Sequence, residues 1–152
     1  NYPVESHVYV MDRKSGEQKV FEADSRFTKN VAEKCESGNY EQWERHNIEN
    51  PHFYDLMYLP QTGMYARLHL GGIEFDAMRD ILNLMDDRDL YLTFFDKDFV
   101  VVGEAKLPSH RYNYFTGWME TNDGVALFVD NSLDENEKTE ELVLDIVRLQ
   151  AD

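Results

Sequence analysis

The sequence predicts a nearly all-β fold, and three features of its 152 residues support this fold class. Hydrophobic residues make up 42% of the chain and aromatic residues 13%, which is enough apolar surface for one folded core. Tyr and Phe, which favour strands, occur nine times each, against eight Gly and four Pro. Most apolar stretches are short, and turn-forming residues separate them.

Four segments of the chain have the form of a strand, a short turn and a second strand. The expected pairs are 7–12 with 18–23, 53–59 with 64–70, 90–95 with 100–107, and 115–120 with 125–130. Gly16 supplies the positive φ that the first turn needs, and the Asn-Asp-Gly sequence at 122–124 is the strongest hairpin signal. A last predicted strand covers residues 141–149.

These hairpins resemble one another, which indicates a repeat architecture. Residues 8–12 resemble 92–96, and residues 54–65 resemble 115–126. The alternation predicts a β-propeller whose blades are sheets of four antiparallel strands. We expect a single domain, a partial β-propeller over 1–152, with the outer strands of one blade at 1–25, a complete blade at 26–108 and three strands of the last blade at 109–152. At about 40 to 50 residues per blade, these would be the C-terminal part of a larger ring.

Two insertions between the strands have helical character. Residues 28–47 are polar with sparse apolar contacts such as Trp43, and apolar side chains recur at helical spacing in residues 73–85. We expect Asp76 or Asp80 to cap the start of the second segment.

The negative charge of the chain excludes some classes of binding partner. There are 30 Asp and Glu against 15 Lys and Arg, a formal net charge of −15. Such a surface repels phosphate, so we expect no nucleic-acid partner and no binding to an anionic membrane surface. The single cysteine, Cys35, excludes an internal disulfide and a zinc site of several thiolates, and we interpret it as a half-buried small hydrophobe.

Three stretches carry a resemblance to a known family. Residues 92–108 (LTFFDKDFVVVGEAKLP), 112–115 (YNYF) and 50–54 (NPHFY) resemble the closing blades of the TolB-like six-bladed β-propeller family, within it the uncharacterised exported lipoproteins of Bacteroides-type bacteria. The resemblance implies a six-bladed ring and an extracytoplasmic, cell-envelope location. It also implies a lipid anchor upstream of this chain as the sole membrane attachment. It implies no reaction, and the short chain departs from the family pattern.

The long connections at 26–52, 71–89, 108–114 and 131–140 are expected to gather on one face of the propeller and to carry binding. Arg67 is interpreted as an anion clamp or, alternatively, as a structural partner of Asp55. The rings at 112, 114, 115 and 118 would stack on a sugar or a peptide, or else pack between blades. The candidate ligand-binding residues are His52, Tyr54, Arg67, His69, Tyr112, Tyr114 and Trp118.

Catalytic and metal motifs are weak in this sequence. His46, His52 and Asp55 do not have the spacing of a zinc motif, and Ser109 beside His110 lacks a nucleophile elbow. The oxygen-rich segment 130–137 is a calcium candidate without the EF-hand spacing, and it is interpreted as a solvated acidic loop. We therefore predict no catalytic residue, metal or cofactor.

The preferred function is a non-enzymatic binding scaffold of an exported propeller, whose long-loop face binds a peptide, protein or glycan. One alternative is a hydrolase or lyase with its active site in the central channel of the ring. Another is a structural part of a surface complex, for which an exposed apolar patch would be the mark.

Overall fold

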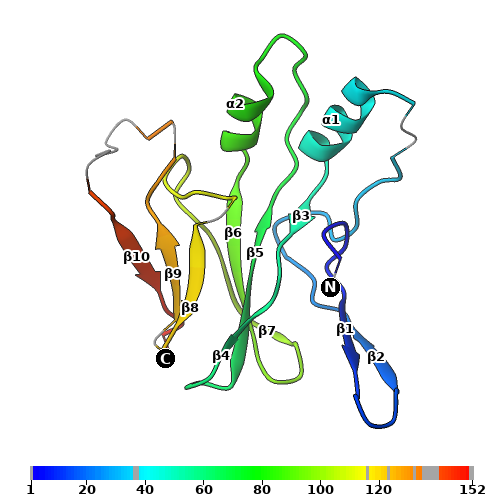
Figure 1. Ribbon diagram of the computed structural model, residues 1–152, viewed down its shortest axis with the longest axis vertical. Helices are drawn as coiled ribbons and strands as arrows, with labels where there is room; N and C mark the ends of the chain where they lie inside the picture. The colour runs from blue at the N-terminus through cyan, green and yellow to red at the C-terminus, as the bar shows by residue number, and fades with distance from the viewer. Residues whose placement is uncertain are drawn as a thin grey trace.

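A computed structural model describes residues 2–35, 38–115, 117–122, 124–131, 133–134 and 141–150. Their strands form three antiparallel sheets of two, five and three strands (Figure 1). The five-stranded sheet lies between the other two, and both of its faces contribute to a core. No helix in the described ranges is long and apolar enough to cross a membrane.

The two-stranded sheet is the first predicted hairpin. Strand β1 (Val8–Met11) pairs antiparallel with β2 (Gln18–Phe21). The turn works because Gly16 has a φ of 73° and because the Asp12 carboxylate accepts hydrogen bonds from the backbone N–H groups of Lys14 and Ser15 at 2.9 and 2.7 Å. The sequence prediction of this hairpin is confirmed.

The five-stranded sheet holds the second and third predicted hairpins. Its strands are β3 (His52–Phe53), β4 (Met57–Leu59), β5 (Met64–Leu70), β6 (Leu90–Phe95) and β7 (Val101–Lys106). The order is β3-β5-β6-β7, and β4 also pairs with β5. The strand predicted over 53–59 is therefore divided into two short strands, whereas the pairing of β6 with β7 is as predicted.

The three-stranded sheet comprises β8 (Trp118–Thr121), β9 (Gly124–Phe128) and β10 (Leu144–Val147). Strand β9 lies in the middle and pairs antiparallel with both neighbours. The predicted fourth hairpin is confirmed by the β8–β9 pair, and the predicted last strand is shorter than expected.

Strand β5 separates two apolar cores because its side chains alternate between the faces of the sheet. Leu68 and Leu70 join a large core that includes Leu127 of β9. On the opposite face, Tyr65 packs with a smaller core that includes Phe95 and Val8 of β1. The β5 strand thus ties the N-terminal hairpin to one side and the C-terminal sheet to the other.

The two helices lie at one end of the five-stranded sheet, away from the β1–β2 and β6–β7 turns (Figure 1). Helix α1 (Tyr40–Glu49) begins after Asn39, whose side chain accepts from the Gln42 N–H at 2.9 Å. Helix α2 (Ile81–Asp86) begins after Asp80, which caps it as one of the two predicted residues. Both helices are shorter than the insertions in which helical character was expected.

The predicted propeller is wrong. The described residues form three small sheets, one of them with five strands where a blade would have four, and no closed ring. Turn residues and strand patterns specify local hairpins, but the way sheets associate depends on side chains distant in sequence. The sheets fall within 1–25, 26–108 and 109–152, and the assignment of the chain to a single domain remains a prediction.

Candidate functional site

An apolar cleft of about 330 Å³ opens between the two helices. Helix α1, helix α2 and the segment before β8 each supply part of its wall. The two helices contact each other, so they form one continuous rim.

The α1 wall follows from helical spacing. Residues 40, 43, 44 and 47 lie on one face of a helix, and all four line the cleft as Tyr40, Trp43, Glu44 and Asn47. The rings of Tyr40 and Trp43 stack with their centroids 5.6 Å apart. The buried side of the helix is held by Ile48. Helix α1 therefore has one face in the core and a second, aromatic face open to solvent.

The α2 wall is aliphatic. Ile81, Leu82 and Met85 line the cleft, whereas Leu84 points into the protein and is buried. Leu82 is 64% exposed, so much of this aliphatic wall faces solvent.

The buried guanidinium of Arg88 fixes the two walls relative to each other. Its Nε donates to the Gly71 carbonyl at 2.8 Å, and its Nη atoms donate to the carbonyls of Asn47 and Asn50 at 2.8 and 2.6 Å. The two asparagine carbonyls lie at the C-terminal end of α1, where helix carbonyls lack partners and the dipole favours a cation. Burial lowers the pKa of Arg88 to about 10, so it stays charged at neutral pH.

The third wall is aromatic and comes from Tyr114 and Phe115. Together, four large apolar side chains around the cleft are exposed by half or more: Tyr40 70%, Trp43 50%, Leu82 64% and Phe115 75%. Single exposed apolar residues are common on proteins, but a group of them around a cavity is typical of a binding surface.

Of the seven residues proposed from the sequence, His52 and Tyr114 line this cleft. Tyr54 lies behind it, with its ring 4.8 Å from that of His52 and 4.5 Å from that of Trp118. Burial raises the pKa of Tyr54 and lowers that of His52. Tyr112 is buried in the large core, and its hydroxyl donates to Asp145 at 2.8 Å.

The other two proposed residues, Arg67 and His69, are 1% and 0% exposed, so a ligand reaches neither without opening the fold. Arg67 donates to the carbonyls of Ser6 and Ala23 at 2.6 and 2.7 Å, and its guanidinium carbon lies 4.7 Å from the centre of the Phe53 ring. These carbonyls, and not the expected Asp55, are its hydrogen-bond partners. Arg67 thereby fastens the N-terminal hairpin to the central sheet.

His69 lies in a buried cluster of catalytic residue types. Its Nε2 is 3.2 Å from the Ser25 hydroxyl and 3.8 Å from the Glu104 carboxylate. A Ser-His-acid triad needs the hydroxyl and the acid on opposite ring nitrogens. Here both face Nε2, and Nδ1 has no hydrogen-bond partner among the described residues. Burial lowers the pKa of His69 to about 3, so its ring is neutral and the cluster is structural.

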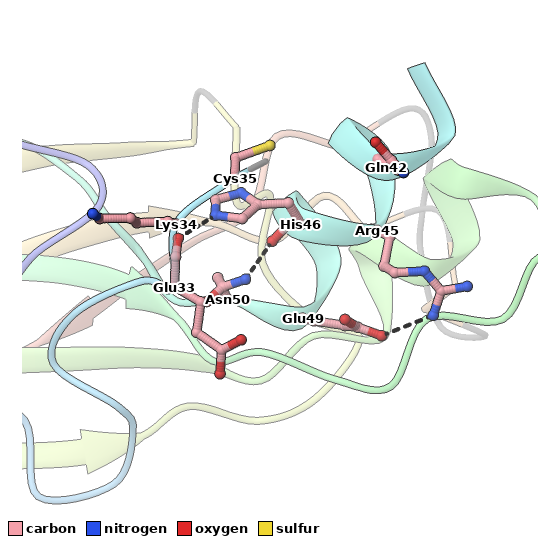
Figure 2. A pocket seen from close by; sticks show the side chains of 8 residues that line it. All are labelled: Glu33, Lys34, Cys35, Gln42, Arg45, His46, Glu49 and Asn50. Atoms are coloured by element: carbon pink, nitrogen blue, oxygen red, sulfur yellow. Dashed lines mark hydrogen bonds and ion pairs between the residues drawn. The ribbon is translucent and has the colours of Figure 1, made fainter. Parts of the chain in front are cut away.

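A second, polar pocket of about 250 Å³ lies on the other side of α1 (Figure 2). Its groups bind one another: His46 Nε2 donates to the Glu33 carbonyl at 2.7 Å, Asn50 donates to the His46 carbonyl at 2.9 Å, and Arg45 pairs with Glu49. Cys35, which lines this pocket, is exposed, so its predicted half-burial is wrong. Because the side chains of His46, Asn50, Arg45 and Glu49 already pair with protein groups, this pocket is a weaker candidate than the apolar cleft.

The metal and nucleophile alternatives gain no support from the described part of the chain. It contains no group of three or more His, Cys, Asp and Glu placed to hold a metal ion. His110 lies 2.8 Å from the Asp87 carboxylate, which keeps its ring nitrogen occupied. The calcium candidate 130–137 includes residues 132 and 135–137, which lie outside the described residues.

Sequence reasoning missed most of the cleft. Tyr40, Trp43 and Leu82 were not proposed as binding residues, and Phe115 appeared only within the ring cluster. The helical spacing of Tyr40, Trp43 and Asn47 was a usable signal, because it places two rings on one face of a polar helix.

No protein-family model matches the sequence, and no curated protein matches it. Among solved structures, the chain is similar to a member of the DUF4221 family from Bacteroides vulgatus, with a TM-score of 0.78 and 19% sequence identity. The match covers 96% of this chain and 40% of that chain. At this identity the likeness concerns the fold alone.

The resemblance to the TolB-like six-bladed propeller family is corrected by this result. The similar structure is a DUF4221 family member, and the described residues form small sheets without a closed ring. The motifs at 92–108 and 50–54 are accounted for by β6, β7 and β3, which are strands of one five-stranded sheet. Such strand and turn patterns occur in many antiparallel sheets, so they did not specify a family.

Proposed function

We propose that the chain is a binding module whose cleft between α1 and α2 accepts a large apolar side chain from a peptide or protein partner. The observation that supports this proposal is the cavity of about 330 Å³ bordered by four exposed apolar side chains. Water would have to be released from these side chains on binding, and that release provides the driving force.

The lining favours a peptide over a glycan. Most of the exposed wall is hydrocarbon from Ile81, Leu82, Met85 and the rings of Trp43 and Phe115. A sugar also stacks on rings, but it needs several polar groups converging on its hydroxyls. Methionine adapts its shape to irregular apolar side chains, which suits a segment that inserts one or two anchors.

The alternative of a hydrolase or lyase loses its proposed location, because that site was the central channel of a ring. The buried cluster of Ser25, His69 and Glu104 does not replace it, because the hydroxyl and the carboxylate both face Nε2 of the imidazole. The extracytoplasmic location and the upstream lipid anchor remain predictions.

A peptide selection on the whole chain tests the proposal. Peptides selected from a random library are synthesised and titrated against the Trp118→Phe variant, in which Trp43 is the only tryptophan and its fluorescence reports on the cleft. We expect the selected peptides to share an aromatic or large aliphatic residue and to change this emission.

Two substitutions test whether binding depends on the aromatic side chains of the cleft and not on exposed rings elsewhere. Removing a central aromatic anchor typically costs at least about tenfold in affinity, so Trp43→Ala and Phe115→Ala should each weaken binding by that factor. Their affinities are measured by calorimetry, because Trp43→Ala removes the fluorescent reporter. Tyr58 on β4 is 51% exposed, close to the 50% of Trp43, and Tyr58→Ala serves as the matched control with unchanged affinity. Equal losses in all three variants, or selection of glycans instead of peptides on an array, would overturn the proposal.

A further inference from the structure

Building on the proposed function, we infer that the bound segment carries a Lys or Arg side chain next to its apolar anchor. The juxtaposition behind this inference is a carboxylate, Glu44, beside the stacked rings of Tyr40 and Trp43 on the cleft face of α1.

Glu44 is available to a ligand. It is half-buried, it lines the cleft, and it forms no ion pair with the described residues. Its neighbour Arg45 does not neutralise it, because Arg45 pairs with Glu49 at 3.3 Å and lies over the Phe75 ring at 4.8 Å. Among the described residues, the Glu44 carboxylate therefore has no ion-pair partner, and it lies in a cleft whose lining is mostly apolar.

The rings beside Glu44 suit a cation as well as an apolar group. The faces of Trp and Tyr carry negative electrostatic potential, and they attract ammonium and guanidinium groups. With Tyr40 four residues before Glu44 on the same helix face, a single cationic side chain can contact a ring and the carboxylate together. The methylene groups of Lys or Arg would cover the ring edges at the same time.

The charge around the cleft has the same sign. Residues 38–50 and 80–89 contain seven Asp and Glu against Arg45 and Arg88. Three of the seven form ion pairs, Glu49 with Arg45, Asp87 with Arg79 and Asp89 with Lys106, so the excess of negative charge comes from the other four. Arg88 is buried against backbone carbonyls, so its charge does not face the rim. The net charge of −15 for the whole chain adds a long-range attraction for cationic partners that weakens with salt.

A set of three synthetic peptides tests this inference. They share one Trp or Leu anchor and differ only in the flanking residues, which are Lys, Gln or Glu. We expect the Lys peptide to bind the wild-type chain about fivefold to tenfold more tightly than the Gln peptide, and the Glu peptide to bind most weakly. The advantage of the Lys peptide should shrink as salt is raised.

Substitutions at Glu44 test whether this residue causes the preference for the Lys peptide. Glu44→Gln should remove most of the difference in affinity between the Lys and Gln peptides. The affinity for the Gln peptide should stay as in the wild type. Glu44→Lys should reverse the order of preference. Glu17→Gln, which removes an exposed carboxylate on the β1–β2 turn, should leave all affinities as in the wild type. Thermal unfolding of each variant checks that the fold is intact.

The outcomes distinguish this inference from the proposed function. If all three peptides bind with equal affinity and Trp43→Ala weakens the binding of each, the proposed binding module stands and the preference for a cationic partner is refuted. If the preference for Lys persists in Glu44→Gln, recognition at this carboxylate is refuted. If none of the peptides binds at millimolar concentration, the proposed function fails and the inference fails with it.

Discussion

Replacing His69 should remove a pH dependence from the stability of the chain. Burial lowers the pKa of this imidazole from 6.5 to about 3, and its ring lies between those of Phe53 and Tyr91 at 5.2 and 5.0 Å. The unfolded chain therefore takes up a proton as the pH falls below 6.5, whereas the folded chain does not. Protonation of the unfolded state lowers the free energy of unfolding, so this contribution is fully present above pH 6.5 and is lost on acidification.

The magnitude follows from the two pKa values. Between pH 7 and pH 5 the unfolded histidine passes from mostly neutral to almost fully protonated, which corresponds to a loss of about 2 kcal/mol at 1.36 kcal/mol per pKa unit. The folded histidine, with its pKa of about 3, contributes almost nothing in this window.

The assay is urea unfolding of the wild-type chain, His69→Phe and His69→Gln at pH 7 and pH 5. Both variants lose stability at pH 7, because each disrupts the contact with the Ser25 hydroxyl. Their loss relative to the wild type should shrink by about 2 kcal/mol at pH 5, because only the wild type has the histidine. The same wild-type advantage at both pH values would refute the assignment of a neutral, buried His69.

Three further substitutions test the local assignments. Arg67→Met leaves the carbonyls of Ser6 and Ala23 without their donor, so urea unfolding should show a free energy of unfolding lower by about 2 to 4 kcal/mol. A decrease below about 1 kcal/mol would contradict the role of Arg67 in holding the N-terminal hairpin on the central sheet. Arg88→Met should speed amide hydrogen exchange in α1 much more than in β9, and equal protection in both elements would contradict its role at the helix end. Asn39→Ala removes the cap of α1 and should cost about 1 kcal/mol in urea unfolding, with an unchanged midpoint as the contrary result.

Local structure was predictable from this sequence because single residues determine it. The Gly16 turn, the alternation along 64–70 and the Asp80 cap each depend on backbone chemistry within a few residues, and the structure contains all three. The arrangement of the sheets was not predictable in this way. It depends on contacts such as those of Arg67 with Ser6 and Ala23, which precede Arg67 by 61 and 44 residues.

The candidate site was only partly predictable for a similar reason. His52 and Tyr114 were found because they lie in connections rich in aromatic residues. Alternation placed Arg67 on the correct face of β5, but it gave no sign that a hairpin covers that face. The cleft itself needs α1 and α2 side by side, and Arg88 achieves this through carbonyls about 40 residues away, a relation that no local pattern encodes.

The binding surface that we propose is the cleft between the two helices. The most direct test is an NMR titration of the isotope-labelled chain with a selected peptide. We expect the largest amide shifts at residues 40–47, 81–85 and 114–115. Shifts concentrated in β1 and β2, or along β10, with the helix amides unmoved would contradict it.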